Sequence, residues 1–197
     1  MIFDYPANRQ ERRHGPSGYA SYESYRPWLR DEFEFRCVYC LKRETWGQAT
    51  SEFELDHFEP QSINSDRRVD YFNLVYACRR CNSVKQDQSV DDPFDLLHSA
   101  NIATQADGSL LSRDIATRRL LRQLDLNSPR IKSWRLMWMR IVELAAERDP
   151  ELYDRLVGLP DDLPDLSRLR APQNHRRENV EQCCFARRRR GELPTAY

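Results

Sequence analysis

Two short cysteine pairs constrain the fold of this chain more than any other feature. Both have the spacing Cys-x-x-Cys, one at Cys37 and Cys40 and one at Cys78 and Cys81. Two such pairs are typical of a tetrahedral zinc site, because each forms a tight turn that presents two thiolates about 2.3 Å from the metal. The alternative is four buried free cysteines, but two pairs at this spacing are improbable among six cysteines. The spacing therefore predicts a structural zinc that stabilises a small folded unit.

The distance between the pairs and the remaining cysteines add two expectations. The 37 residues that separate Cys40 from Cys78 exceed the usual spacing in a zinc ribbon, so a folded element should lie between the pairs. Cys183 and Cys184 are adjacent, cannot readily bind one metal together, and are expected to be ordinary thiols. The N-terminus lacks the apolar core of a secretory signal, and no apolar run approaches 18 residues. We expect a reducing, cytoplasmic setting without disulfides.

Between the pairs, the stretch FELDHFEPQS (residues 53–62) places a carboxylate beside an imidazole. Phe53 and Leu55 alternate with glutamates, which predicts a strand over residues 53–57. Asp56 and His57 lie at the end of that strand, where packing has no need of them. Phosphodiester hydrolysis needs an activated water, a cation on the phosphate and stabilisation of the departing oxyanion. An imidazole can supply the base and a carboxylate can hold the cation, although a satisfied surface pair is the commoner role of such a dipeptide.

Three segments, taken in order, resemble the HNH endonuclease family in its zinc-knuckle form. They are CVYC, FELDHFEPQS and YFNLVYACRRCNSVK, and together they span about residues 37–87. They follow the pattern Cys-x-x-Cys, Asp-His-x-x-Pro-x-Ser and Asn-Leu-x-x-x-Cys-x-x-Cys-(His or Asn), with a lysine three residues on. The resemblance implies a helix-rich α+β fold with a ββα-metal core, in which a β-hairpin precedes a helix and the zinc site clamps the unit. The helix is expected to begin near Asn73 or after the second cysteine pair.

The resemblance also implies roles for individual residues. His57 would be the general base, and Asp56 and Asn82 would hold a divalent cation, with Mg²⁺ or Mn²⁺ favoured by these hard oxygen ligands. Asn73 would fix the loop that orients the base, and Lys85 would lie near the phosphate. Asn82 stands where many members carry histidine, which makes this a His-Asn-Asn variant. The implied activity is metal-dependent hydrolysis of DNA, and because one unit has one active site, a single chain is expected to nick.

Two other functions stay open at this point. A non-catalytic zinc-ribbon module, including a degenerate relic that still binds DNA, could bind nucleic acid or protein with the same cysteines. A relative that cleaves RNA could use the same metal chemistry, although the sequence carries no RNA-recognition signature. The combined presence of Asp56, His57, Asn73 and Asn82 favours catalysis, since a relic would be free to lose any of them.

The formal net charge of the chain is zero, but individual segments carry a clear net charge. The net charge is −5 over residues 31–70, +6 over residues 113–140 and +3 over residues 171–197. Basic segments would suit phosphates, although a solvated helix face is the ordinary interpretation of any arginine run. The predicted helix within residues 111–128 has leucines on one side and arginines on the other. The candidate nucleic-acid-binding residues are Arg79, Arg80, Arg118, Arg119 and Arg122.

Composition divides the chain into four parts. They are an N-terminal arm expected to be extended or loosely packed (1–28), the nuclease core (29–95), a helical extension (96–170) and a basic, mobile tail (171–197). In the extension, Ser128 and Pro129 predict the start of a long helix that ends near residues 149–150. This extension is similar to the one in HNH proteins of bacterial anti-phage systems, including the nuclease of Septu-type systems. That resemblance implies a role in antiviral defence and a protein partner such as an ATPase.

Overall fold

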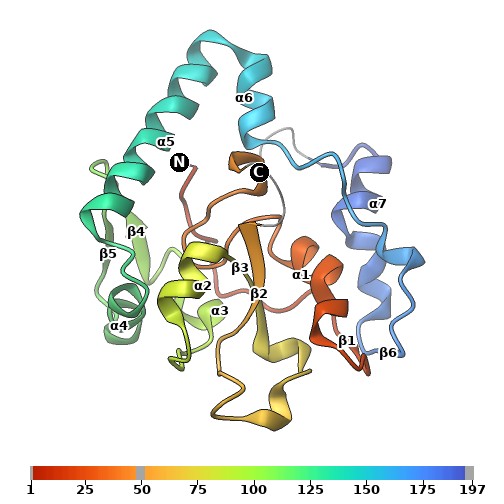
Figure 1. The fold of residues 1–197 in the computed structure, drawn as a ribbon. Coiled ribbons are helices and arrows are strands. Elements are labelled where there is room, and N and C mark those ends of the chain that lie inside the picture. Colours follow the sequence, from red (N-terminus) through yellow and green to blue (C-terminus); the bar gives the residue numbers. More distant parts are fainter. Residues whose placement is uncertain (1, 48–51, 194–197) are drawn as a thin grey trace.

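The computed structural model describes residues 2–47 and 52–193 (Figure 1). It is a mixed α/β fold in which helices surround small two-stranded antiparallel sheets. The helices are α1 Arg26–Glu32, α2 Arg79–Lys85, α3 Pro93–Leu96, α4 Ile115–Gln123, α5 Pro129–Arg148, α6 Pro150–Val157 and α7 Cys184–Arg189. The strands are β1 Pro16–Ser17, β2 Phe53–His57, β3 Leu74–Cys78, β4 Ile102–Thr104, β5 Leu110–Ser112 and β6 Gln173–Asn174. The predicted helix-rich α+β class is confirmed.

The central unit is a β-hairpin followed by a helix, as the resemblance implied. β2 pairs antiparallel with β3, with Phe53 opposite Cys78 and His57 opposite Leu74. The predicted strand over residues 53–57 is therefore confirmed. α2 begins directly after β3, inside the second cysteine pair. A helix start near Asn73 is wrong, because Asn73 ends a single turn of 3-10 helix and leads into β3.

Aromatic side chains form much of the core around this hairpin. Phe53 stacks on Tyr76 across the two strands, with ring centroids 5.0 Å apart. The predicted N-terminal arm (1–28) has no helix over its described residues up to Ser21 but ends in a 3-10 helix and the start of α1, and it is not loosely packed. Phe3 is 1% exposed and contacts the rings of Trp46 and Trp134 edge-on. Burial of such aromatic side chains holds the first residues of the chain against the core.

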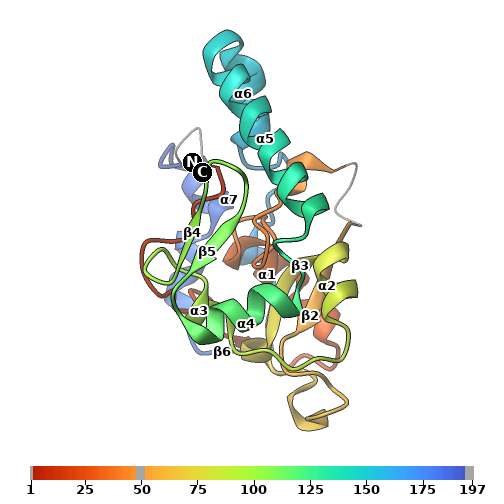
Figure 2. The same cartoon turned by 90° about the vertical axis from the view of Figure 1, so that its left-hand side faces the viewer.

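The helical extension follows the predicted pattern closely. In α4 the leucines are buried and the arginines Arg118, Arg119 and Arg122 are exposed. α5 begins at Pro129, as predicted, and forms with α6 a hairpin that projects from the body of the molecule (Figures 1 and 2). Trp138 of α5 stacks on Trp46 with ring centroids 4.5 Å apart. No helix in the described part of the chain is long and apolar enough to span a membrane.

The C-terminal segment is packed rather than mobile as far as residue 193. β6 pairs with β1, which ties residues 173–174 to the N-terminal segment. The backbone N–H of Cys184 donates to Asp31 Oδ1 at 2.6 Å, and Cys183 and Cys184 are buried. The sequence suggested mobility because this segment is polar and basic, but two buried cysteines anchor it. The last four residues of the predicted tail lie outside the described residues, as does residue 1 of the predicted arm.

Candidate active site and metal centre

The four predicted zinc ligands meet in one buried cluster. The sulfur atoms of Cys37, Cys40, Cys78 and Cys81 all lie within 4.8 Å of one another, and Cys40 Sγ is 3.7 Å from Cys78 Sγ. Four thiolates that bind one zinc at about 2.3 Å lie about 3.8 Å apart. Hydrogen bonds from Cys37 and the other thiols lower the pKa of Cys78, whereas burial raises the pKa of Cys37 and hydrogen bonds to the other cysteines raise that of Cys81, so the metal-free cluster concentrates negative charge on Cys78. Spacing, burial and soft donors therefore fit a structural zinc.

The first cysteine pair also supports the acidic residue of the motif. Tyr39, between Cys37 and Cys40, donates its hydroxyl to Asp56 Oδ2 at 2.8 Å. The backbone N–H of Val38 donates to the carbonyl of Tyr76 at 2.9 Å, which holds the pair against β3. The first cysteine pair therefore fixes the position of a carboxylate that lies on the strand next to β3.

Asp56 forms a buried ion pair on its other oxygen. Lys85 Nζ lies 3.0 Å from Asp56 Oδ1 and also donates to the carbonyl of His57 at 2.7 Å. Lys85 is only 1% exposed although it was predicted to lie near a phosphate. Each carboxylate oxygen has two lone pairs, so one acceptor site on each oxygen of Asp56 is left for a cation.

Glu54 and Asn82 form a second contact between β2 and α2. Asn82 Nδ2 donates to Glu54 Oε2 at 2.6 Å. Alternate residues of a strand share a face, so Glu54 and Asp56 both point toward α2. Two carboxylates and the amide oxygen of Asn82 therefore lie on one side of the hairpin. These hard oxygen donors fit Mg²⁺ or Mn²⁺ better than a soft metal.

His57 is the last residue of β2, and both of its ring nitrogens have partners. Nε2 lies 2.8 Å from the carbonyl oxygen of Arg68, and Nδ1 lies 3.2 Å from Gln61 Nε2. A carbonyl only accepts, so Nε2 carries the proton, and the lone pair of Nδ1 accepts from the Gln61 amide. Burial lowers the pKa of His57 below its ordinary value of 6.5, against the opposing effects of the Arg68 carbonyl and Asp56. The imidazole is therefore neutral at pH 7.

Asn73 holds the loop that supplies the carbonyl partner of His57. It is fully buried, and its Oδ1 accepts from the N–H of Glu59 at 3.0 Å. Its Nδ2 donates to the carbonyls of Glu59 at 2.9 Å and Arg67 at 3.3 Å. The carbonyl of the next residue, Arg68, bonds the imidazole. The amide thus fixes both ends of the loop that orients His57.

The predicted arginines occupy different surroundings. Arg79 is exposed and lies 3.3 Å from Glu54, beside Asn82. Arg80 instead bonds the carbonyl of Leu124 at 2.7 Å, which joins α2 to the end of α4. Arg118, Arg119 and Arg122 lie on the exposed side of α4 and not beside His57.

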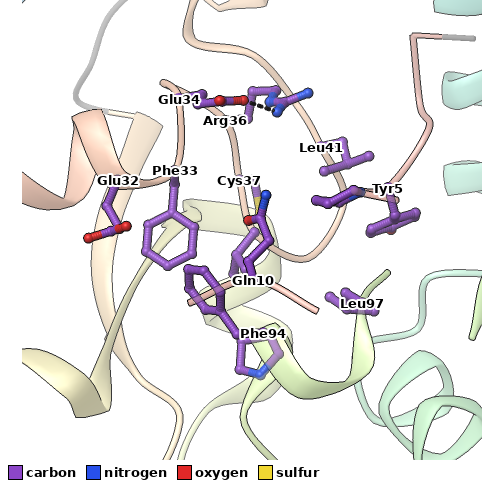
Figure 3. A pocket seen from close by; sticks show the side chains of 13 residues that line it. Tyr5, Gln10, Glu32, Phe33, Glu34, Arg36, Cys37, Leu41, Phe94 and Leu97 are labelled. Carbon is purple, nitrogen blue, oxygen red and sulfur yellow. Dashed lines mark hydrogen bonds and ion pairs between the residues drawn. The ribbon is translucent and has the colours of Figure 1, made fainter. Parts of the chain in front are cut away.

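A small pocket adjoins the first cysteine pair (Figure 3). Phe33, Phe94, Leu41 and Leu97 give it mainly apolar walls, and its volume of about 40 Å³ suits little more than water. Neither Asp56 nor His57 lines it, so it is no part of the candidate site.

Several contributors to the site were missed by sequence reasoning. Tyr39 lies inside a cysteine pair, and only the fold shows that its hydroxyl reaches Asp56. Tyr22 packs edge-on against the His57 ring, with centroids 4.9 Å apart, from a distant N-terminal segment. The Arg68 contact uses a backbone carbonyl, which any residue type would supply. Gln61 had a visible signal, because it follows His57 by four residues within the motif.

Comparison with known protein families gives a match to part of the chain. Residues 37–88 match the family model described as HNH endonuclease. The match begins at Cys37 and includes both cysteine pairs, Asp56, His57 and Asn82. A search among curated proteins found no significant match to the chain.

Proposed function

We propose that this protein is a metal-dependent endonuclease that hydrolyses phosphodiester bonds in DNA, because residues 37–88 match the HNH endonuclease family model. The geometry of His57 carries the proposal. Its Nε2 proton is held by the Arg68 carbonyl, so Nδ1 is the basic nitrogen, and its lowered pKa keeps it neutral. A neutral imidazole in a fixed orientation can take a proton from water at neutral pH.

Asp56 and Asn82 would hold the divalent cation, with Glu54 close enough to add negative charge. When bound, the cation would supply positive charge to the scissile phosphate and the departing oxygen. Lys85 holds Asp56 in place through its buried ion pair. Asp56 leaves β2 toward α2 and His57, the next and last residue of the strand, leaves from the other face, so the proposal requires the phosphate to lie across the strand end between the two side chains. We place the attacking water on the Nδ1 side of His57, where it would replace the Gln61 amide as the hydrogen-bond partner of the imidazole.

The cysteine cluster would hold a structural zinc with no part in proton transfer. Its contribution is to fix β3 and the first cysteine pair, and through Tyr39 the carboxylate of Asp56. Loss of zinc would therefore disturb the catalytic site indirectly, through the hairpin.

A second candidate is a non-catalytic zinc module, favoured by one observation. The ion pair with Lys85 stabilises the Asp56 carboxylate without a divalent cation. A relic that binds DNA but does not cut it could therefore retain this ion pair. The catalytic proposal rests on the additional hydrogen bonds that fix His57 and the loop held by Asn73. A binding module does not need these contacts. A defence role and an ATPase partner stay predictions from the extension alone.

The experiment that tests the proposal compares substrates and metals. Zinc-loaded protein is incubated with supercoiled plasmid, linear duplex, single-stranded DNA and structured RNA, each with Mg²⁺, Mn²⁺ or neither. Conversion of supercoiled to open-circle plasmid that requires Mg²⁺ or Mn²⁺ is expected, since one active site cuts one strand. Cleavage of RNA alone would overturn the choice of substrate. Tight DNA binding without cleavage in any metal would favour the zinc module.

A further inference from the structure

Two surface hollows adjoin along the helical extension. One, of about 460 Å³, lies between β5 and α4 and includes Arg118 and Arg122 in its lining. The other, of about 700 Å³, lies between the cysteine cluster, α2 and the start of α5, and includes Arg80 and Arg130. Asp125 and Ser128 line both hollows, so the two lie next to each other. We call the pair the basic groove. Its cations are Lys42, Arg80, Arg118, Arg122 and Arg130.

Some cations of the basic groove are paired with acidic side chains, and the others give the groove its positive charge. Lys42 is paired with Glu52, and Arg80 contacts Asp125 at 3.2 Å. Arg118, Arg122 and Arg130 form no ion pair with an acid in the part of the chain that the structure describes.

Arg118 has one acidic neighbour on α4. Asp114 caps this helix, and a hydrogen bond from the N–H of Thr117 lowers the pKa of that carboxyl, with a smaller contribution from Arg118. Among the described residues, Asp125 is the one acidic residue that lines either hollow. Three exposed guanidinium groups therefore exceed the acidic charge of the groove.

The basic groove lies across α2 from the candidate active site. Arg80 and Val84 line the groove, four residues apart on one face of α2. Asn82 and Lys85 contact β2 from a different face of the same helix. The exposed residues Arg79 and Ser83 lie between them. Figure 2 shows α2 and α4 side by side below the start of α5.

The distance across α2 between the candidate active site and the basic groove suits a nucleic-acid backbone. A helix with its side chains is about 10–12 Å wide, and a DNA duplex advances about 3.4 Å along its axis for each phosphate of one strand, so about three base-pair steps of duplex span α2. A strand cut at the end of β2 would therefore place further phosphates at the groove. Arginine is suited to such contacts because its planar guanidinium binds phosphate oxygens in pairs.

We propose that the basic groove binds the DNA backbone beyond the cleavage site, so that Arg118, Arg122 and Arg130 hold the substrate while β2 and α2 cut it. This rests on the proposed function and assigns a substrate-holding role to the helical extension. The binding is electrostatic and independent of base sequence. Arg119, although exposed on α4, does not line the groove and is not part of this surface.

The test measures DNA binding by the full chain, with cleavage blocked by His57→Ala. The groove variant carries Arg118→Gln, Arg122→Gln and Arg130→Gln. The control carries Arg140→Gln, Arg148→Gln and Arg155→Gln, three exposed arginines of the α5–α6 hairpin. Both lose three charges and keep helix-forming side chains. The Kd for a 30-base-pair duplex is measured from 50 to 200 mM salt, with zinc content and circular dichroism as folding checks.

The groove variant is expected to bind at least ten-fold more weakly at 50 mM salt, with a salt slope smaller by two to three. The control should bind as its parent does. Equal binding by both variants, or equal loss in both, would overturn the proposal. If the triple variant misfolds, the three single variants are measured instead, and each should lower the slope by about one.

Cleavage separates this proposal from the proposed function. A groove variant that retains His57, binds normally and nicks plasmid at the parent rate would overturn the groove alone. A parent chain that binds duplex through the groove but never cleaves would overturn the nuclease and leave the groove standing.

Discussion

Lys85 and Asp56 form an ion pair inside the protein, with Nζ 3.0 Å from Oδ1 and side chains only 1% and 5% exposed. A buried charge whose partner is removed is strongly destabilising, because it keeps its desolvation penalty without compensation. The lysine that the family resemblance placed near the phosphate therefore also has a structural role, and the two roles can be separated by experiment.

Replacing Lys85 with alanine is expected to lower the free energy of unfolding by about 3–5 kcal/mol. The control is Lys132→Ala, which removes an exposed pair with Asp107 and should cost less than about 1 kcal/mol. Urea denaturation of the zinc-loaded protein measures both. A Lys85→Ala protein as stable as its parent but inactive would contradict the structural role and place the ammonium at the phosphate.

Replacing Asn73 with alanine should impair catalysis through the loop rather than through the reacting atoms. The change leaves the N–H and carbonyl of Glu59 without their amide partner, which should cost about 1–3 kcal/mol of stability. We expect kcat to fall at least ten-fold with little change in KM, because His57 loses its fixed orientation. Asn64→Ala, which removes one partly exposed contact to Glu59, is the control. Unchanged kcat in Asn73→Ala would refute a positioning role.

The pH dependence of cleavage should report the lowered pKa of His57. A general base must be neutral, so the rate should rise with pH and reach its plateau with a midpoint below 6.5. Stability should follow the same sign. The unfolded chain takes up the proton at higher pH than the folded one, so acidification below about 6.5 favours unfolding. A midpoint clearly above 6.5 in single-turnover cleavage at saturating metal would contradict the assignment.

Zinc should be lost from variants of the cluster and kept by variants of the other cysteines. Cys78→Ser is expected to abolish zinc binding and the cooperative unfolding transition, because the metal joins both pairs to the hairpin. Cys183→Ala is the matched control, since Cys183 is equally buried but lies outside the cluster. Metal analysis should give one zinc per control chain. A full zinc complement in Cys78→Ser would contradict a four-cysteine site.

Local patterns predicted the elements of the fold well. The alternation of Phe53 and Leu55 predicted β2, and Pro129 marked the start of α5. Both signals are local, because hydrophobic periodicity and helix-start residues can be recognised within a few neighbouring residues. The second cysteine pair did not reveal where α2 begins. Its residues suit a tight turn and a first helical turn equally, and only the pairing of β3 with β2 decides between them.

Long-range contacts were beyond sequence reasoning. Nothing in the residues 1–28 distinguishes a loose arm from a packed one, because Phe3 reaches Trp134 only in the folded chain. The contact of Tyr39 with Asp56 and the burial of Lys85 likewise depend on how three elements meet. Spacing predicted which residues gather near the site, and packing decided which of their atoms face one another.

The central claim is that His57 takes the proton from the attacking water, and single-turnover nicking of supercoiled plasmid tests it most directly. The parent, His57→Ala and His175→Ala are compared with zinc bound and Mg²⁺ or Mn²⁺ added. His175 is exposed in the C-terminal segment, so it controls for loss of a histidine. We expect nicking by the parent and by His175→Ala. We expect at least a hundred-fold loss in a folded, zinc-bound His57→Ala, which is the lower end of what a general base contributes. Parent-like nicking by His57→Ala would contradict it.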